Sequence, residues 1–330
     1  MNQQECDKLY SKGMGKLKTS FFSFKFSPDY VGAIDDFTAA AKGFRKLGQS
    51  GKSITCFKKA IECNHHINDY WAEGNCYVSI AEIYFFDLKT PDQGIEALNK
   101  ASYAYQVSGK FTYSVKAFIT TAERFMENKE YEIAGKILKE AFNVCEGNTE
   151  DKLVGATFEQ IFNKLLDVLC GLNKWEEAIG ITQKYIDAQK KYPEKDNYRI
   201  NKTYMKLCIL RIITKEEFLC EDIFIQMFNC RYEDTATDIG DIRKLMDALK
   251  DLDKKKFTYC VSSAFTLFEN NLLKGLQVLY KEKEEEKKNG GTKIEDNVNI
   301  KKKDDNNDIN TDNPPNNNNI NNAMDNEDLC

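Results

Sequence analysis

The chain has 330 residues and a formal net charge of -5, so it is long enough for one large helical array or two ordinary domains. Hydrophobic residues make up 42% and charged residues 30%, which is ordinary for a soluble protein and leaves no global basic field to hold nucleic acid. No apolar run approaches the roughly 18 residues that span a bilayer, and the first residues do not resemble a secretory signal.

The first predicted helix covers residues 1–20. An aromatic-rich connection, Phe21-Phe22-Ser23-Phe24-Lys25-Phe26, follows it. Ser27 is the expected N-cap of the next helix and Pro28 its expected first residue, because proline is favoured in the first turn of a helix. Helices of about 14–18 residues, separated by short turns, are then predicted as far as Pro193.

One short phrase recurs along these helices. It has an aromatic residue, two spacers and a small residue, as in Tyr30-Val31-Gly32-Ala33, Tyr131-Glu132-Ile133-Ala134 and Trp175-Glu176-Glu177-Ala178. Weaker matches to this pattern lie at Gly74, Gly94, Val115 and Gly155. A small residue recurring about every 20 residues, or about every 40 for a helix pair, indicates stacked helical hairpins that approach closely.

The phrase fades after Pro193, although helical segments are predicted over 200–213, 216–228, 239–252 and 259–280. The sequence therefore predicts an all-α fold. A tetratricopeptide-like α-solenoid of antiparallel helical hairpins covers 1–195, and a C-terminal helical bundle covers 196–282 and closes the stack. Residues 283–330 predict a disordered, Asn-rich, acidic tail, with 281–288 either a solvated helix end or the start of that tail.

Signals for catalysis or metal binding are weak. Gly51-Lys52-Ser53 resembles the end of a phosphate-binding loop, but Lys46 occupies the position of its first glycine and the preceding residues are helical. His65 and His66 lie near Cys63, without a second ligand cluster at zinc spacing. The eleven cysteines contain no C-x-x-C pair and predict reduced, buried thiols. We expect no enzyme activity, no metal and no cofactor.

The phenylalanines of the first connection, Phe21, Phe22, Phe24 and Phe26, leave two interpretations open. Beside Lys18 and Lys25 they could insert shallowly into a membrane interface. Alternatively, two or three of them close the N-terminal end of the solenoid.

Several phrases resemble the soluble NSF attachment proteins (SNAPs), most closely the gamma type. The resemblance to the gamma type rests on Lys18-Thr19, Pro28-Asp29-Tyr30, Ala39-Ala40-Ala41 with Phe44, Asn99-Lys100-Ala101-Ser102 and Leu329-Cys330. Ser20-Phe21-Phe22-Ser23 and Gly109-Lys110-Phe111-Thr112 with Lys116 are more similar to the alpha type. The resemblance spans about residues 5–280 and the last few residues, but the Asn-rich tail has no counterpart in the family.

The resemblance implies an adaptor without covalent chemistry of its own. SNAPs wrap the four-helix SNARE bundle left after membrane fusion and hand it to NSF, a hexameric AAA ATPase that pulls it apart with ATP. It implies a cytoplasmic protein, peripherally associated with membranes, that functions in vesicle-mediated transport.

The resemblance also implies three groups of site residues. Lys110, Lys116 and Lys164 match basic positions that face the acidic SNARE bundle, and Lys110 and Lys116 could share a helix face. The family has a further lysine where this chain has Gln160. The four phenylalanines match a loop that touches the bilayer. Glu327, Asp328 and Leu329 match the acidic end that stimulates the ATPase.

Two other functions stay open from the residues alone. One is a generic tetratricopeptide-like scaffold that binds peptide segments of other proteins. The other is a nucleotide-binding enzyme, which would rest only on Gly51-Lys52-Ser53.

Overall fold

A computed structural model describes residues 1–19, 27–148, 154–192 and 196–298. Every regular element in these ranges is a helix, as the sequence predicts. In chain order they are α1 (Gln3–Leu17), α2 (Tyr30–Lys46), α3 (Ser50–His66), α4 (Tyr70–Glu82), the π-helix η1 (Ile83–Asp87), α5 (Pro91–Val107), α6 (Phe111–Glu127), α7 (Tyr131–Glu146), α8 (Val154–Gly171), α9 (Trp175–Lys191), α10 (Asn197–Ile213), the 3-10 helix η2 (Glu217–Leu219), α11 (Cys220–Asn229), α12 (Thr235–Asp251), α13 (Lys254–Ser263) and α14 (Asn270–Val298).

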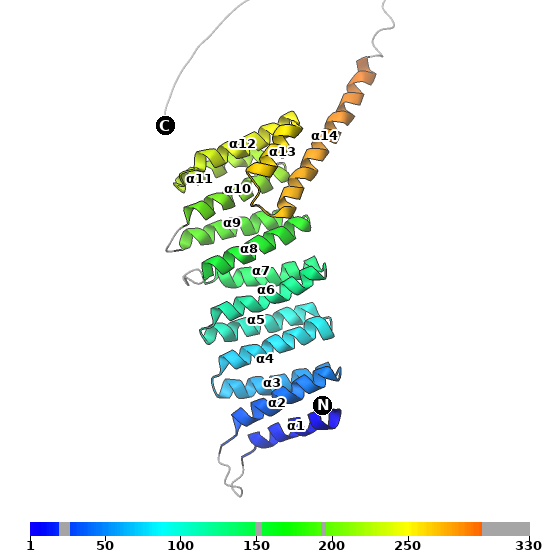
Figure 1. Ribbon diagram of the computed structural model, residues 1–330, viewed down its shortest axis with the longest axis vertical. Coiled ribbons are helices and arrows are strands. Elements are labelled where there is room, and N and C mark those ends of the chain that lie inside the picture. The colour runs from blue at the N-terminus through cyan, green and yellow to red at the C-terminus, as the bar shows by residue number, and fades with distance from the viewer. Residues whose placement is uncertain (20–26, 149–153, 193–195, 299–330) are drawn as a thin grey trace, which may run out of the picture. The chain divides into compact units, whose positions relative to one another are not determined.

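Helices α1 to α10 form an antiparallel stack in which each helix packs against the next one in the chain (Figure 1). Ion pairs join α2 to α4 and α6 to α8, whereas others join α5 to α7 and α7 to α9. Even-numbered and odd-numbered helices therefore form two layers. This is the predicted α-solenoid.

The small residues of the recurring phrase lie where helices approach closely. Ala33, Ala134 and Ala178 are completely buried. A Cβ atom added to Gly74 would lie 2.7 Å from the ring of Tyr105, and one added to Gly94 would lie 2.6 Å from the ring of Phe85. Gly155 has open space around it, so this weaker match to the pattern has no packing role.

Local polar groups decide where several helices begin. Asn2 and Glu5 form a capping box at the start of α1, in which each side chain accepts the backbone N–H of the other residue. The start of α2 differs from the prediction by two residues. Asp29 is its N-cap instead of Ser27, because the Asp29 carboxylate accepts the N–H of Gly32 at 2.9 Å.

The chain divides by internal contacts into one compact unit, Met1–Lys283, and a second unit, Glu284–Cys330. The predicted boundary at residue 195 stays a prediction. The predicted helix over 259–280 is wrong in its middle, because α13 ends at Ser263 and α14 begins at Asn270. Phe265 and Phe268 are buried in the intervening segment, which therefore packs as a core element.

Helix α14 continues to Val298, into the region where the sequence predicts a disordered tail from residue 283. Its Lys- and Glu-rich part, residues 281–288, has strong helix formers and pairs of opposite charge at helical spacing. These local preferences extend the helix after its apolar residues end. No helix within the described ranges is both long enough and apolar enough to cross a membrane.

The ten cysteines in the described ranges are free thiols, and all but Cys230 are buried. Burial raises the pKa of Cys56 and Cys63 to about 11 and that of Cys76 to about 12. Such thiols stay protonated at neutral pH and are poor nucleophiles. The prediction of buried thiols is confirmed for the described cysteines other than Cys230.

Candidate protein-binding surface

The three lysines predicted to bind a partner lie in the even-numbered layer. Lys110 is the N-cap residue of α6, Lys116 is in the second turn of α6, and Lys164 is on α8. Helices α6 and α8 contact each other directly. The stack therefore brings Lys116 and Lys164, which are far apart in the sequence, onto neighbouring helices of one layer.

Lys110 and Lys116 do not share a helix face. Six residues of α-helix correspond to about 240° of rotation, so the two side chains leave α6 in different directions. Both side chains are exposed. Neither forms an ion pair with another residue in the described ranges, and both ammonium groups are therefore available to an acidic partner.

Lys164 is already paired. Its ammonium group lies 3.0 Å from a carboxylate oxygen of Glu123 on α6, and both side chains are partly exposed. Glu123 is seven residues after Lys116 and so lies on the same face of α6. An acidic partner has to compete with Glu123 for Lys164. Such a partly solvated pair contributes only about 0–1 kcal/mol, so the exchange costs little.

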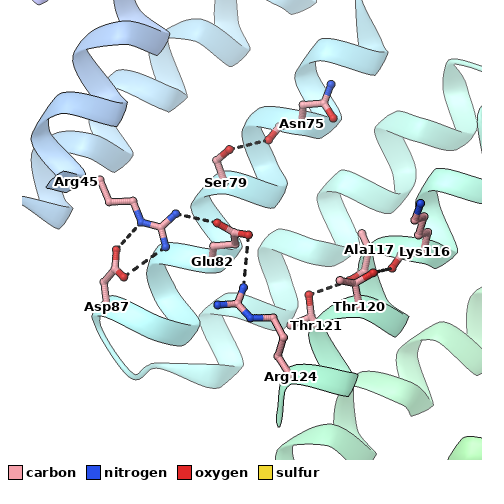
Figure 2. A network of polar contacts seen from close by, with 10 residues as sticks. All are labelled: Arg45, Asn75, Ser79, Glu82, Asp87, Lys116, Ala117, Thr120, Thr121 and Arg124. Atoms are coloured by element: carbon pink, nitrogen blue, oxygen red, sulfur yellow. Dashed lines mark hydrogen bonds and ion pairs between the residues drawn. The ribbon is translucent and has the colours of Figure 1, made fainter. Parts of the chain in front are cut away.

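A network of charged residues that includes Arg124 of α6 was not predicted from the sequence (Figure 2). The guanidinium of Arg45 donates to Asp87 and to Glu82, at 2.8 Å each. Arg124 on α6 lies 3.6 Å from the other carboxylate oxygen of Glu82. The network therefore joins α2, the α4–η1 region and α6.

The π-helix η1 accounts for the geometry of this network. It follows α4 directly, and its residue Phe86 lies under the guanidinium of Arg124, 3.6 Å from the ring centroid. Phe85 and Phe86 also contact the ring of Phe125, with centroids 5.3 and 5.4 Å apart. The run Ile83-Tyr84-Phe85-Phe86 does not follow helical spacing, and this irregularity is the signal that could have located the site.

Burial lowers the pKa of Arg45, but the hydrogen bonds to Asp87 and Glu82 together outweigh that effect. The pKa of Arg45 is therefore above its ordinary value. Arg45 therefore stays charged, and its bonds to two acidic side chains fix the spacing between the second and fourth helices. Similar pairs continue along the layer: Arg199 on α10 contacts Glu159 on α8, and Lys202 contacts Asp238 on α12. These contacts join successive helices of the layer.

The features that resembled chemical sites have structural roles. Gly51, Lys52 and Ser53 lie in the first turn of α3, where the Ser53 hydroxyl is buried and donates to the carbonyl of Ala41 at 2.8 Å. His65 lies at the end of α3, 3.2 Å from Glu73. Across the described ranges no cluster of three His, Cys, Asp or Glu side chains could hold a metal ion.

Two predicted sites lie outside the described residues. They are the phenylalanine segment, with Phe21, Phe22, Phe24 and Phe26, and the acidic end, with Glu327, Asp328 and Leu329. Both stay predictions.

The chain matches the model of one protein family. The family model described as "Soluble NSF attachment protein, SNAP" matches residues 4–269. A curated relative, the "Soluble NSF attachment protein homolog FPV011" of Fowlpox virus (strain NVSL), is 28% identical over 128 residues. That alignment covers 39% of this chain and only 46% of the relative.

Two solved structures show a distant likeness. BtubC (BKLC) from P. vanneervenii is 12% identical with a TM-score of 0.31, and the match covers 68% of this chain and 91% of that chain. The TPR2AB domain of yeast Sti1 in complex with pHSP90 is 13% identical with a TM-score of 0.25, covering 78% and 99%.

Proposed function

Because this chain belongs to the soluble NSF attachment protein (SNAP) family, we propose that it is an adaptor that binds SNARE complexes and presents them to an NSF-type AAA ATPase for disassembly. The family match over residues 4–269 carries the proposal. The chain supplies no covalent chemistry in this scheme and needs no cofactor of its own. It acts in the cytoplasm, at membranes where vesicles fuse.

The even-numbered layer supports the proposal physically. A SNARE bundle is a rod of four helices with an acidic surface, and a rigid array of helices with free ammonium groups can lie along it. Lys110 and Lys116 carry charges that no described residue neutralises, while Lys164 exchanges Glu123 for a carboxylate of the bundle. We propose the gamma type as the closest subtype, from the phrases quoted above.

Reconstitution with purified NSF and a SNARE complex tests the proposal. We expect ATP-dependent disassembly that requires this chain and a higher ATPase rate in its presence. A generic peptide-binding scaffold would give neither result and would be indifferent to removal of residues 327–330.

Replacing both Lys110 and Lys116 with glutamate should weaken SNARE binding by about tenfold at low ionic strength. Each reversal turns an attraction at the surface into a repulsion, and salt screens both. Affinity measured by titration at two salt concentrations checks this, with Lys139→Glu and Lys184→Glu on the odd-numbered layer as the matched control. Equal weakening by the control pair would contradict the placement of the surface.

Replacing Phe21 and Phe22 with serine should slow disassembly of membrane-anchored SNAREs more than that of soluble SNAREs. The reason is that interfacial aromatic residues raise the local concentration of the adaptor at the bilayer. Disassembly rates on vesicles and in solution measure the difference. Equal slowing on both substrates would favour the alternative in which these rings pack against the end of the solenoid.

A further inference from the structure

Four apolar side chains are exposed at the turns that join α3 to α4 and α5 to α6. Ile67 follows α3, Trp71 is the second residue of α4, Val107 ends α5 and Tyr113 is the third residue of α6, and they are 38%, 44%, 46% and 48% exposed. These four residues are named the aromatic edge. Isolated apolar side chains on a surface need no explanation, but a group gathered on successive turns indicates a contact surface.

The two turns of the aromatic edge are neighbours. Tyr105 on α5 lies against Gly74 near the start of α4, and its hydroxyl donates to the side chain of Asn75 at 2.7 Å. The same ring lies 6.1 Å from the ring of Tyr113 at the start of α6. Tyr105 therefore connects the beginnings of α4 and α6 and makes the aromatic edge one continuous surface.

The α5–α6 part of the aromatic edge is basic. Residues 97–122 contain Lys100, Lys110 and Lys116 but no aspartate or glutamate, although Lys100 pairs with Glu96 at 2.6 Å. Two acidic residues lie at the α3–α4 turn: the Asp69 carboxylate accepts the N–H of Ala72 at 2.9 Å and caps α4, and Glu73 lies 3.2 Å from His65. Lys110 and Lys116 have no ion pair among the described residues, so the α5–α6 turn carries uncompensated positive charge, which favours an anionic partner.

The aromatic edge also lies on a particular side of the stack. In an antiparallel array alternate turns fall on the same side, and the α3–α4 and α5–α6 turns share the side on which α1 ends at Leu17 and α2 begins at Tyr30 (Figure 1). The chain segment that joins α1 to α2 contains the four phenylalanines proposed to touch the bilayer.

We propose that the aromatic edge is a second membrane-contact surface, which lies in the headgroup region of an anionic bilayer. Trp and Tyr have an apolar body and a polar tip and are enriched at that depth, and lysines beside them attract anionic lipids. The inference rests on the proposed peripheral membrane function. Its apolar residues differ from the four phenylalanines, whereas its unpaired lysines, Lys110 and Lys116, are also those proposed to bind the SNARE bundle. A contact along this edge lets the bilayer fix the orientation of the stack as well as its distance.

The experiment uses the full chain and vesicles of phosphatidylcholine with roughly 30% phosphatidylserine. Vesicle binding is measured by flotation. In parallel, the emission of Trp71 is obtained as the difference between the chain and its Trp71→Phe variant, because the chain has only two tryptophans. Lipids brominated at a known depth quench a tryptophan that reaches them.

Two double variants separate the aromatic edge from general hydrophobicity. Val107→Ser with Tyr113→Ser should reduce quenching of Trp71 and lower vesicle affinity by about tenfold. Phe218→Ser with Ile225→Ser is the matched control, since these residues are 72% and 62% exposed but lie on η2 and α11. The control should bind vesicles like the unaltered chain, and vesicles of phosphatidylcholine alone should bind the unaltered chain several-fold more weakly.

Each other outcome overturns the inference. If the chain floats with vesicles while Trp71 is not quenched, the membrane function stands and the aromatic edge has no part in it. If Val107→Ser with Tyr113→Ser weakens binding to a soluble SNARE complex and leaves Trp71 quenching unchanged, the surface binds protein. If the chain does not float at all, the proposed membrane association fails together with the inference.

Discussion

Replacing Lys206 with alanine is expected to lower the free energy of unfolding of the C-terminal helices by about 3–5 kcal/mol. Lys206 on α10 forms an ion pair with Glu269, and the two side chains are only 10% and 8% exposed. Its ammonium group also donates to the Asn163 side chain at 3.0 Å and lies over the rings of Phe162 and Phe268.

The size of the expected effect comes from the charge that would remain. The second carboxylate oxygen of Glu269 is buried and has no hydrogen-bond partner, so Lys206 is the main group that compensates this charge. Without Lys206, Glu269 has to stay buried unpaired, take up a proton, or move into solvent and pull Phe268 with it. Each alternative weakens the contact between α10 and the segment before α14.

Chemical denaturation followed by Trp175 fluorescence in a Trp71→Phe background measures this effect. Trp175 reports on the correct region, because its ring packs against Gly275 of α14. The matched control is Arg243→Ala, which removes an exposed ion pair to Glu221 and should cost less than about 1 kcal/mol. Replacing Lys206 by methionine and Glu269 by leucine together should recover most of the loss. Similar small losses in Lys206→Ala and Arg243→Ala would contradict the prediction.

The stack itself could be predicted from the sequence because its signal is local and repeated. Ala33, Ala134 and Ala178 return at the spacing of one or more hairpins, and each is completely buried where the pattern predicts a close approach. Helical spacing depends on neighbours three and four residues away, so the local sequence contains the information that determines it.

The polar contacts between distant helices could not be predicted in the same way. Lys206 and Glu269 are 63 residues apart, and a lysine in a helix is ordinarily expected to face solvent. The sequence did carry a hint, because Lys206 is the only charged residue in the segment Tyr204–Leu210, which therefore has no polar face. In the structure this whole segment of α10 is buried. The break at residues 264–269 escaped prediction for a related reason: buried Phe265 and Phe268 look like part of a helical stripe.

For the candidate surface too, local features could be predicted and contacts between distant helices could not. That Lys110 and Lys116 are exposed follows from their polar positions at the start of a helix. The pairing of Lys164 with Glu123, and the network of Arg45, Glu82 and Arg124, depend on which helices become neighbours in the layer. That information is available only once the stacking order is known.

Replacing Leu329 with alanine is expected to abolish most of the stimulation of NSF while SNARE binding stays unchanged. The segment Glu327-Asp328-Leu329 has two negative charges and one apolar side chain, so leucine is its only strong apolar anchor. Burying a leucine contributes about 1.5–3 kcal/mol, and its truncation should therefore weaken docking on a basic, partly apolar site by about tenfold or more.

The chain offers its own control, because Ile320 is an apolar residue of similar size in the same terminal region. Ile320→Ala should leave the ATPase rate unchanged, whereas Leu329→Ala lowers it, and both variants should bind a soluble SNARE complex like the unaltered chain. The long segment before Leu329 adds a second test: removing residues 299–320 shortens the tether, which raises the effective concentration of Leu329 at the ATPase and should increase stimulation at limiting adaptor. A change confined to the tail cannot disturb contacts made by Lys110 and Lys116. An equal loss of SNARE binding and of stimulation in Leu329→Ala would therefore contradict separate tasks for the lysine-bearing layer and the acidic end.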